Sequence, residues 1–116
     1  MKKEFVPYEQ ALALKELGFN EPCFGHYLMK KFYPKEYHRQ GEEITLRPTF
    51  SQSFRWFREE YQMVFCYEPC LKKDLTYIFF IYMETTGEKV FVVESKYNKE
   101  AELACLLKLI EITKNK

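Results

Sequence analysis

The sequence lacks the features that mark several functional classes. No apolar run approaches the ~20 residues that a membrane-spanning helix needs, and the longest, 77–83, has the length of a strand. The four glycines stand singly, so no glycine-rich loop could hold a phosphate. Residues 1–4 turn polar without an apolar core segment, so no signal peptide is expected. We therefore expect a cytoplasmic protein with no membrane association.

The chain also has little net charge. Its 18 basic and 17 acidic residues leave a formal charge of +1. A balance this even gives no overall field that would attract DNA or an anionic membrane. Only a local patch of charge could serve such a ligand.

Aromatic residues are abundant instead. The 116 residues include 11 Phe, 9 Tyr and 1 Trp, and 47% of the chain is hydrophobic. This composition is typical of a packed core, and the length suits one globular domain over 1–116. Each buried aromatic side chain removes roughly 150–250 Å² from water. We expect some rings to remain at a surface that meets a partner.

Two stretches in the first half of the chain have the pattern of capped helices. Over 8–17 the apolar positions share one face, and Gly18 follows where a left-handed cap is needed. Thr49 and Gln52 form a capping-box pattern ahead of a second helix over 50–61. Four aromatic residues at helical spacing predict the main core stripe of that second helix: Phe50, Phe54, Phe57 and Tyr61.

A third helix is predicted over 98–113, with apolar residues on two sides. One stripe holds Leu103, Leu106, Leu107 and Ile110, and the other holds Ala101, Cys105, Leu109 and Ile112. Both stripes cannot face one sheet, and a leucine left in water forgoes roughly 1.5–3 kcal/mol of stabilisation. Either the first helix or another copy of the chain would cover the second stripe. We expect a homodimer through this helix.

Runs of alternating and apolar residues predict strands between the helices. The clearest are 63–67, 75–83 and 89–94, with 75–83 apolar on both faces and therefore central. A hairpin of 23–29 with 43–47 is a further expectation. The fold class is then α+β, with an antiparallel sheet of three to five strands against two or three helices. The expected order is α-(ββ)-α-β-β-β-α.

Metal binding and covalent catalysis were weighed on the cysteines and histidines. Cys23-x-x-His26 and Cys66-x-x-x-Cys70 have gaps that zinc sites use, and His38 is a spare ligand. Without a secretion signal, free buried thiols are the simpler interpretation. No flanking pattern supports a cysteine–histidine nucleophile. We expect no metal, no cofactor and no catalytic residues.

The stretch 30–39 mixes cations with aromatic rings, and Pro34 and Gly41 predict a long exposed loop or hairpin tip there. Its candidate binding residues are Lys30, Lys31, Phe32, Tyr33, Lys35, Tyr37 and Arg39, with Glu36 as the one acidic side chain. Cations for phosphates and rings for stacking suit single-stranded nucleic acid. The same composition suits a protein-binding hot spot. The alternative is a loop whose tyrosines cover the edge of the core.

Three residues of the second helix extend the candidate site. Trp56 points about 120° away from the aromatic stripe at ~100° per residue, with Arg55 and Arg58 on the other flank. An exposed tryptophan would anchor an interface. The alternative is that Trp56 widens the buried face beside Ser53.

Three segments resemble small uncharacterised proteins carried by phages, prophages and mobile elements of gut-type bacteria. They are EFVPYEQALALKELGFNEPC at 4–23, PTFSQSFRWFREEY at 48–61 and AELACLLKLIEI at 101–112. The resemblance implies an accessory gene of a mobile element and carries no assigned activity. The segments 24–47 and 62–75 do not share it.

The second half of the chain resembles a double-stranded RNA-binding domain in outline, with a helix, three strands and a helix in that order. Ser95-Lys96 and Lys99-Glu100 lie near the lysine-rich helix start of that family. The chain departs from the family because the cluster of three lysines that grips phosphates is missing, and Glu100 and Glu102 would repel them.

Taken together, these patterns predict a non-enzymatic accessory protein that binds a protein partner, which could be a second copy of itself. Nucleic-acid binding through 30–39, with Arg55 and Arg58, is the alternative. An excess of aromatic residues favours the first function, and the local basic patch favours the second.

Overall fold

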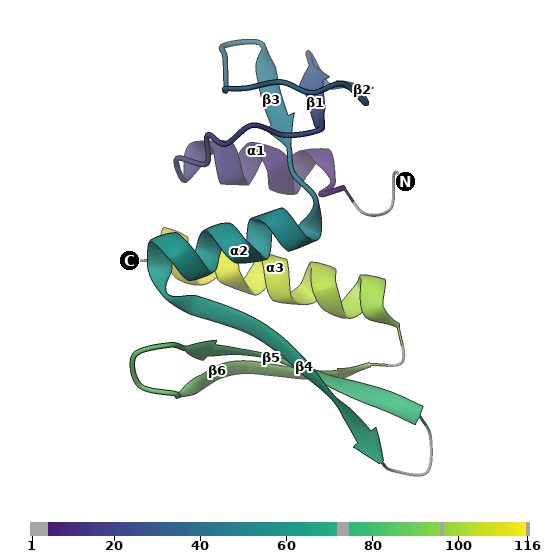
Figure 1. Cartoon of the computed structure of the whole chain (residues 1–116), viewed down its shortest axis with the longest axis vertical. Helices are drawn as coiled ribbons and strands as arrows, with labels where there is room; N and C mark the ends of the chain where they lie inside the picture. Colours follow the sequence, from purple (N-terminus) through teal and green to yellow (C-terminus); the bar gives the residue numbers. More distant parts are fainter. Residues whose placement is uncertain (1–4, 72–74, 96, 116) are drawn as a thin grey trace. The chain divides into compact units, whose positions relative to one another are not determined.

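The computed structural model describes residues 5–71, 75–95 and 97–115. In chain order the elements are α1 (Tyr8–Glu16), β1 (Gly25–Leu28), β2 (Lys31–Tyr33), β3 (Ile44–Arg47), α2 (Phe50–Tyr61), β4 (Met63–Leu71), β5 (Leu75–Met83), β6 (Lys89–Ser95) and α3 (Asn98–Lys114) (Figure 1). Helices and antiparallel sheets in this order confirm the α+β class.

The chain divides into two compact units, residues 1–53 and 54–116, which we call the N-terminal and C-terminal units. The division falls inside α2. Each unit contains its own three-stranded antiparallel sheet. A single domain over 1–116 stays a prediction beside this division.

The sheet of the N-terminal unit has the strand order β2-β1-β3. Gly25 pairs with Arg47 and Leu28 with Ile44, which confirms the predicted hairpin of 23–29 with 43–47. The stretch between these two strands differs from the expected loop. Its residues Lys31–Tyr33 form a third strand, which pairs with the other edge of β1. A two-residue turn between Leu28 and Lys31 makes this possible, although neither turn residue is a glycine.

Helix α1 ends as its sequence predicts. Gly18 has φ of 102°, in the left-handed region that a residue without Cβ adopts without strain. The amide of Phe19 donates to the carbonyl of Leu14 at 3.0 Å, and the amide of Gly18 donates to that of Lys15 at 3.1 Å. These two bonds form a Schellman cap, with Leu14 and Phe19 fully buried beneath it.

Helix α2 uses half of its predicted capping box. The hydroxyl of Thr49 accepts the amide of Gln52 at 3.1 Å. The side chain of Gln52 does not return to Thr49; its Nε2 donates to the carbonyl of Pro22 at 2.9 Å. The start of the helix is therefore tied to the segment before β1 within the N-terminal unit.

The C-terminal unit is built on a sheet with the strand order β4-β5-β6, and α2 and α3 lie on the same face of it (Figure 1). The central place of β5 confirms its prediction. Strand β4 is longer than the expected 63–67, because the chain continues through Pro69 to Leu71. Proline is tolerated there because β4 is an edge strand, where a missing N–H need not interrupt the sheet.

Aromatic rings fill the space between the sheet and the helices of the C-terminal unit. Phe54 stacks on Phe65 at 4.0 Å between ring centroids, and Phe65 lies 6.1 Å from Phe79. Phe57, Phe79 and Ile81 are at most 2% exposed. The predicted aromatic stripe of α2 is therefore part of the core.

Most of the apolar surface of α3 is buried. Five of the predicted stripe positions are at most 5% exposed: Ala101, Cys105, Leu106, Leu109 and Ile110. Leu103 and Ile112 are partly exposed, and Leu107 is 45% exposed. None of the described helices combines the length and the hydrophobicity needed to cross a membrane.

Candidate binding surface of the N-terminal unit

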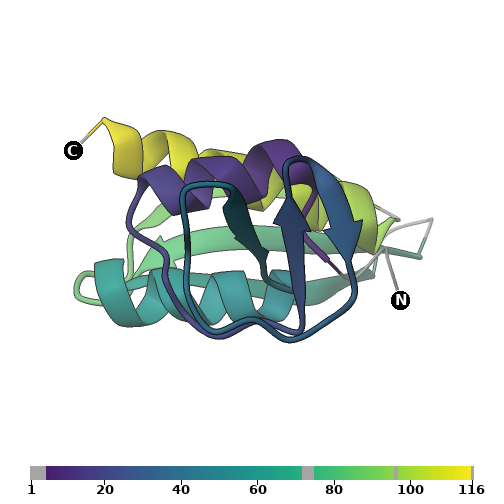
Figure 2. The same cartoon turned by 90° about the horizontal axis from the view of Figure 1, so that it is seen from above.

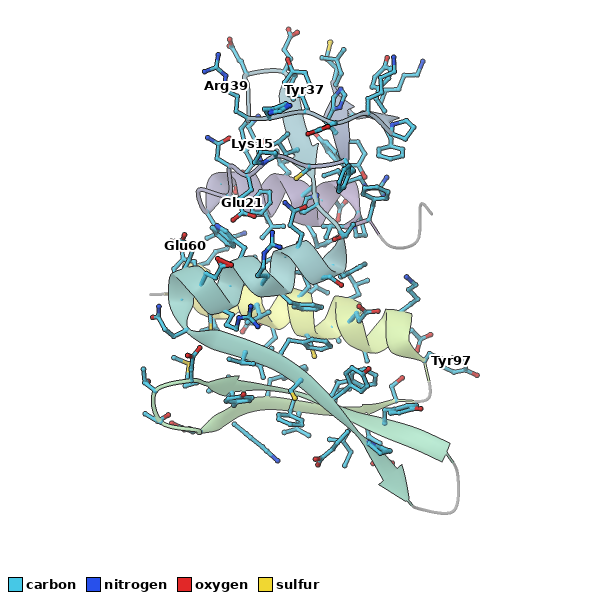
Figure 3. All side chains as sticks on the ribbon, viewed as in Figure 1. Lys15, Glu21, Tyr37, Arg39, Glu60 and Tyr97 are labelled. Atoms are coloured by element: carbon cyan, nitrogen blue, oxygen red, sulfur yellow. The ribbon has the colours of Figure 1, made fainter. Side chains whose placement is uncertain are left out.

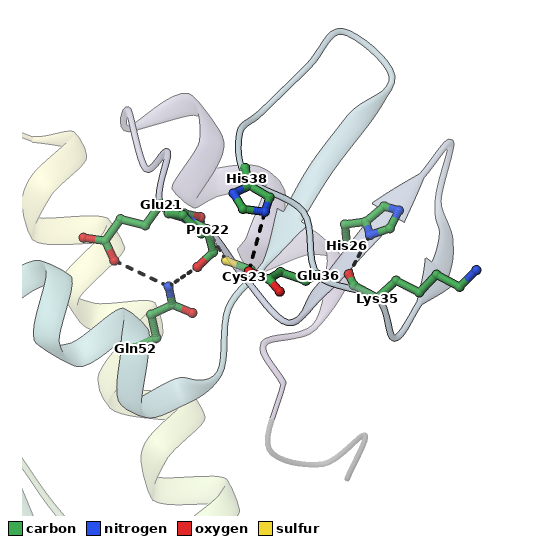
Figure 4. Close-up of polar contacts among 8 residues, drawn as sticks. All are labelled: Glu21, Pro22, Cys23, His26, Lys35, Glu36, His38 and Gln52. Atoms are coloured by element: carbon green, nitrogen blue, oxygen red, sulfur yellow. Dashed lines mark hydrogen bonds and ion pairs between the residues drawn. The ribbon is translucent and has the colours of Figure 1, made fainter.

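One face of the β2-β1-β3 sheet centres on His26. Its ring stacks against Tyr33 at 5.6 Å and lies 4.8 Å from the ring of Tyr37. The Nδ1 of His26 hydrogen-bonds to the carbonyl of Lys35 at 3.0 Å, which makes Nδ1 the donor (Figure 4). His26 is 9% exposed, so the two tyrosines and the segment after β2 hold it in place.

The opposite face of the same sheet is a cation–aromatic cluster. The guanidinium of Arg47 lies 4.4 Å from the ring centroid of Phe32, 5.0 Å from that of Tyr27 and 5.5 Å from that of Phe5. Its Nε donates to the carbonyl of Val6 at 2.7 Å. Burial lowers the pKa of Arg47 and raises that of Tyr27. Phe32 therefore belongs to this internal cluster, apart from the other candidate residues of 30–39.

The ends of β1 leave apolar side chains in solvent. Phe24 is 73% exposed and Met29 72% exposed, the highest values among the large apolar side chains described. Leu28 is 38% exposed and, by strand alternation, shares a face with Phe24 and His26. Strand alternation in 23–29 could have indicated this outward face in the sequence.

The segment 30–39, which follows Met29, carries four cations. Lys30, Lys31, Lys35 and Arg39 are all exposed, and Lys31 Nζ lies 5.7 Å from the ring centroid of Tyr33. Tyr37 and Arg39 project from the segment after β2 (Figure 3). We call the combined set the basic-aromatic surface: Phe24, Leu28, Met29, Lys30, Lys31, Tyr33, Lys35, Tyr37 and Arg39.

The turn at one end of this surface is strained. Met29 has φ of 51° and Lys30 has φ of 79°. Tight hairpin turns require positive φ at both central residues and are normally built from Asn and Gly. An L-residue with a Cβ pays roughly 1–2 kcal/mol for this conformation. Both side chains of this turn, Met29 and Lys30, are exposed to solvent.

Hydrogen bonds hold the segment between β2 and β3 against the chain before β1. Cys23 and Tyr37 exchange two backbone bonds of 2.9 Å, so the two stretches run side by side (Figure 2). The side chain of Gln40 donates to the carbonyl of Phe19 at 3.0 Å and accepts the amide of Leu46 at 2.8 Å. The expected loop is thus a fixed part of the unit.

The candidate zinc ligands do not form a cluster in the described residues. Cys23 Sγ donates to the carbonyl of Glu21 at 3.3 Å, and burial raises the pKa of the Cys23 thiol to about 12 (Figure 4). Cys66 belongs to the other unit, and the side chain of Cys70 lies outside the described residues. His38 instead faces Glu36 at 3.5 Å. No group of three His, Cys, Asp or Glu side chains converges among the residues described.

The candidates on α2 lie in two environments. Trp56 is 5% exposed, with its ring edge-on to Phe57 at 5.0 Å and to Tyr61 at 5.5 Å. This position agrees with the alternative that Trp56 widens the buried face. Arg55 and Arg58 are exposed, and Arg55 pairs with Glu59 at 3.6 Å.

A shallow depression of about 360 Å³ lies beside the strained turn. Its lining carries both signs of charge: Tyr8, Leu12, Lys15, Met29, Lys30, Glu42, Glu43 and Thr45. The ammonium of Lys15 already donates to the carbonyls of Gly41 and Ile44. The depression therefore offers a ligand little beyond the side chains of the turn.

Comparisons with known proteins give no relative. No protein-family model, no curated protein sequence and no solved structure matches the chain. The surfaces of the two units are therefore the features of the protein from which a function can be inferred.

Proposed function

We propose that the protein is a non-enzymatic accessory protein that binds an acidic segment of a protein partner through the basic-aromatic surface. One observation carries the proposal. Phe24 and Met29, the most exposed large apolar side chains described, lie at the two ends of β1, and the exposed Lys30 and Lys31 directly follow Met29. Apolar anchors next to cations match the composition of protein interfaces, where aromatic residues and methionine are enriched.

The charge of the surface specifies the partner. The surface carries four exposed cations, and Glu36, the one acidic side chain within 30–39, lies 3.5 Å from His38. A partner with Asp or Glu beside apolar residues would pair with these cations while covering Phe24 and Met29. Electrostatic complementarity of this kind speeds association and excludes basic partners.

The state of the buried thiols supports a non-enzymatic role. Burial raises the pKa of Cys23 and of Cys105 to about 12, so both are protonated near neutral pH. A thiol reacts as its thiolate, which makes these two side chains poor nucleophiles.

The resemblance of 4–23, 48–61 and 101–112 to proteins of phages and mobile elements supports the accessory role. A cytoplasmic location is part of the same proposal.

Single-stranded nucleic acid is a second candidate ligand for the same surface. The exposure of Lys30, Lys31, Lys35 and Arg39 favours it, because each could neutralise a phosphate. The rings favour it less. Phe32 faces the internal cluster, and the rings of Tyr33 and Tyr37 already contact His26.

Binding to defined probes separates the two candidates. Fluorescent peptides that alternate Glu with Leu or Phe, and a fluorescent single-stranded oligonucleotide, are titrated against the full chain. We expect the peptide to bind, and Phe24→Ser with Met29→Ser to weaken it at least tenfold. The matched control is Tyr97→Ser, which removes an aromatic side chain 65% exposed in the other unit.

Charge-reversal variants and apolar-to-serine variants together distinguish the two ligands. Reversal of Lys31 and Lys35 to Glu should weaken both ligands, whereas the Phe24 and Met29 changes should weaken only the peptide. Oligonucleotide binding that falls steeply with salt, without peptide binding, would replace the proposal by the second candidate. Binding of neither probe would overturn both.

A further inference from the structure

The sheet of the C-terminal unit carries a regular grid of side chains on the face opposite its helices. The strand registers place nine residues in three rows across β4, β5 and β6: Val64–Tyr82–Lys89, Cys66–Phe80–Val92 and Glu68–Ile78–Glu94. Alternation along β5 puts this set on the face opposite Phe79 and Ile81, which are buried beneath the helices. Phe80 lies at the centre of the grid.

The middle row of this grid is apolar, and three of its four corners are charged: Lys89, Glu68 and Glu94. Val92 is 54% exposed beside Phe80, and the ammonium of Lys89 lies 4.6 Å from the ring centroid of Phe80. Antiparallel sheets with one open face normally carry polar side chains on it. Within the described residues of 54–116, both helices lie on the other face (Figure 1). Phe80 itself is 9% exposed, so the exposed apolar surface comes from Val92 and from the partly exposed Val64, Cys66, Ile78 and Tyr82. Residues 54–116 place neither helix over this face.

We propose that this face packs against the same face of a second copy of the chain. The distribution of charge on the grid favours a second copy of the chain as the binding partner. Lys89 lies at one end of the grid, and Glu68 and Glu94 lie at the other. A two-fold axis that crosses the strands along the middle row brings the basic end of one copy over the acidic end of the other.

That axis pairs opposite charges along β6 and places Val64 opposite Glu68 along β4. Lys89 of each copy lies opposite Glu94 of the other, Tyr82 lies opposite Ile78, and Phe80 lies opposite its own equivalent. Face-to-face sheets stack about 10 Å apart with their strands nearly aligned, which suits antiparallel strands in either direction. An axis along the strands would instead place Glu68 opposite Glu94 and bring like charges together.

The sequence predicted a dimer interface on α3, whereas the interface proposed here is the open face of the sheet. Five stripe positions of α3 are at most 5% exposed, which leaves Leu107 as its exposed apolar residue. The sheet face is also separate from the basic-aromatic surface, because it belongs to the other unit. A dimer would therefore carry two copies of that surface.

Sedimentation equilibrium of the full chain at micromolar concentration tests the proposal. We expect the mass of two chains for the parent and of one chain for Val92→Arg and for Lys89→Glu. The double variant Lys89→Glu with Glu94→Lys should regain the mass of two chains, because the swapped charges again meet across the axis. Leu107→Arg, the matched change on α3, should remain a dimer.

Cross-linking locates the interface independently. The axis brings Cys66 of the two copies opposite each other, so a short bis-maleimide should join them in a Cys70→Ser background. Cys66→Ser should abolish the product. Cys23 and Cys105 are buried, with pKa values raised to about 12, and should stay unreactive.

Three results would overturn the proposal. The first is a parent of one-chain mass up to high micromolar concentration. The second is a dimer that Leu107→Arg dissociates and Val92→Arg does not. The third is a charge swap that fails to restore the dimer lost in Lys89→Glu while the variant keeps the far-ultraviolet circular dichroism of the parent.

Discussion

The two units build three-stranded sheets by different means. The strands of the N-terminal unit have three or four residues, and hydrogen bonds from Gln40 and Lys15 hold the chain around them. Strands β4 and β5 have nine residues each, and stacked aromatic rings hold them to the helices. The first unit depends on particular polar contacts and close approaches, whereas the second depends on buried apolar volume.

Loss of volume in the C-terminal unit should have the largest effect on stability. Phe79 is 2% exposed under the helices, so Phe79→Ala should cost ~3–5 kcal/mol of unfolding free energy. Urea denaturation followed by circular dichroism measures it. Leu107→Ala, on α3 and 45% exposed, should change the unfolding free energy by less than about 1 kcal/mol. Equal effects of the two changes would contradict the placement of the core.

A close approach in the N-terminal unit should give the next effect. A Cβ at Gly25 would lie 2.8 Å from Phe32 Cε1 and 3.1 Å from Phe5 Cε1, so these rings must move. We expect Gly25→Ala to cost about 1–3 kcal/mol, as overpacking does. Gly41→Ala is the control, because its Cβ would meet Ile44 at an ordinary 3.5 Å. Thermal melts that rank Gly41→Ala as the worse variant would count against this packing.

The strained turn should respond in the opposite direction. Lys30 has φ of 79°, so Lys30→Gly should raise the unfolding free energy by up to about 1 kcal/mol. Lys31→Gly, one residue later in β2, should lower it by roughly 0.5–1 kcal/mol. Chemical denaturation of both variants decides the point. A loss of stability in Lys30→Gly would mean that the turn has another conformation.

The smallest effect is expected from mildly alkaline pH, with one buried thiol in each unit. Folding raises the pKa of Cys23 and Cys105 from 9.0 to about 12, so the folded state retains protons that the unfolded state loses. The associated stability is complete below pH 9 and is lost as the pH rises toward 12. The melting temperature should fall between pH 9 and 10, and fall less in Cys23→Ala and Cys105→Ala. An identical fall in all three proteins would argue against buried thiols.

The sequence predicted the elements whose pattern repeats along the chain. The aromatic spacing of α2 and the two-sided strand at 75–83 depend on neighbours in sequence, and both are confirmed. Strand β2 was missed because it has three residues and follows a turn of Met29 and Lys30, without the glycine that marks such turns. The extension of β4 was missed because Pro69 was read as a break.

The candidate surface was predictable only in part. Exposure of the cations in 30–39 follows from their charge. Phe32 and Tyr33 point to opposite faces of the sheet because side chains alternate along β2. A stretch predicted as a loop has no such alternation, so the sequence did not separate the two rings. The side chain of Gln40 connects Phe19 with Leu46, which are far apart in sequence, and no local sequence pattern predicts these hydrogen bonds. Phe24 and Met29 became candidates only when their exposure was known.

Helix α2 has a consequence for cooperativity. It has 12 residues and contains the division between the units, so Phe50 and Phe57 lie on opposite sides of that division within one run of backbone hydrogen bonds. A helix this short is marginal in water without packing at both ends. Melting of either unit would therefore fray the helix that starts or ends the other. The two sheets, which share no strand, should nevertheless unfold in a single transition.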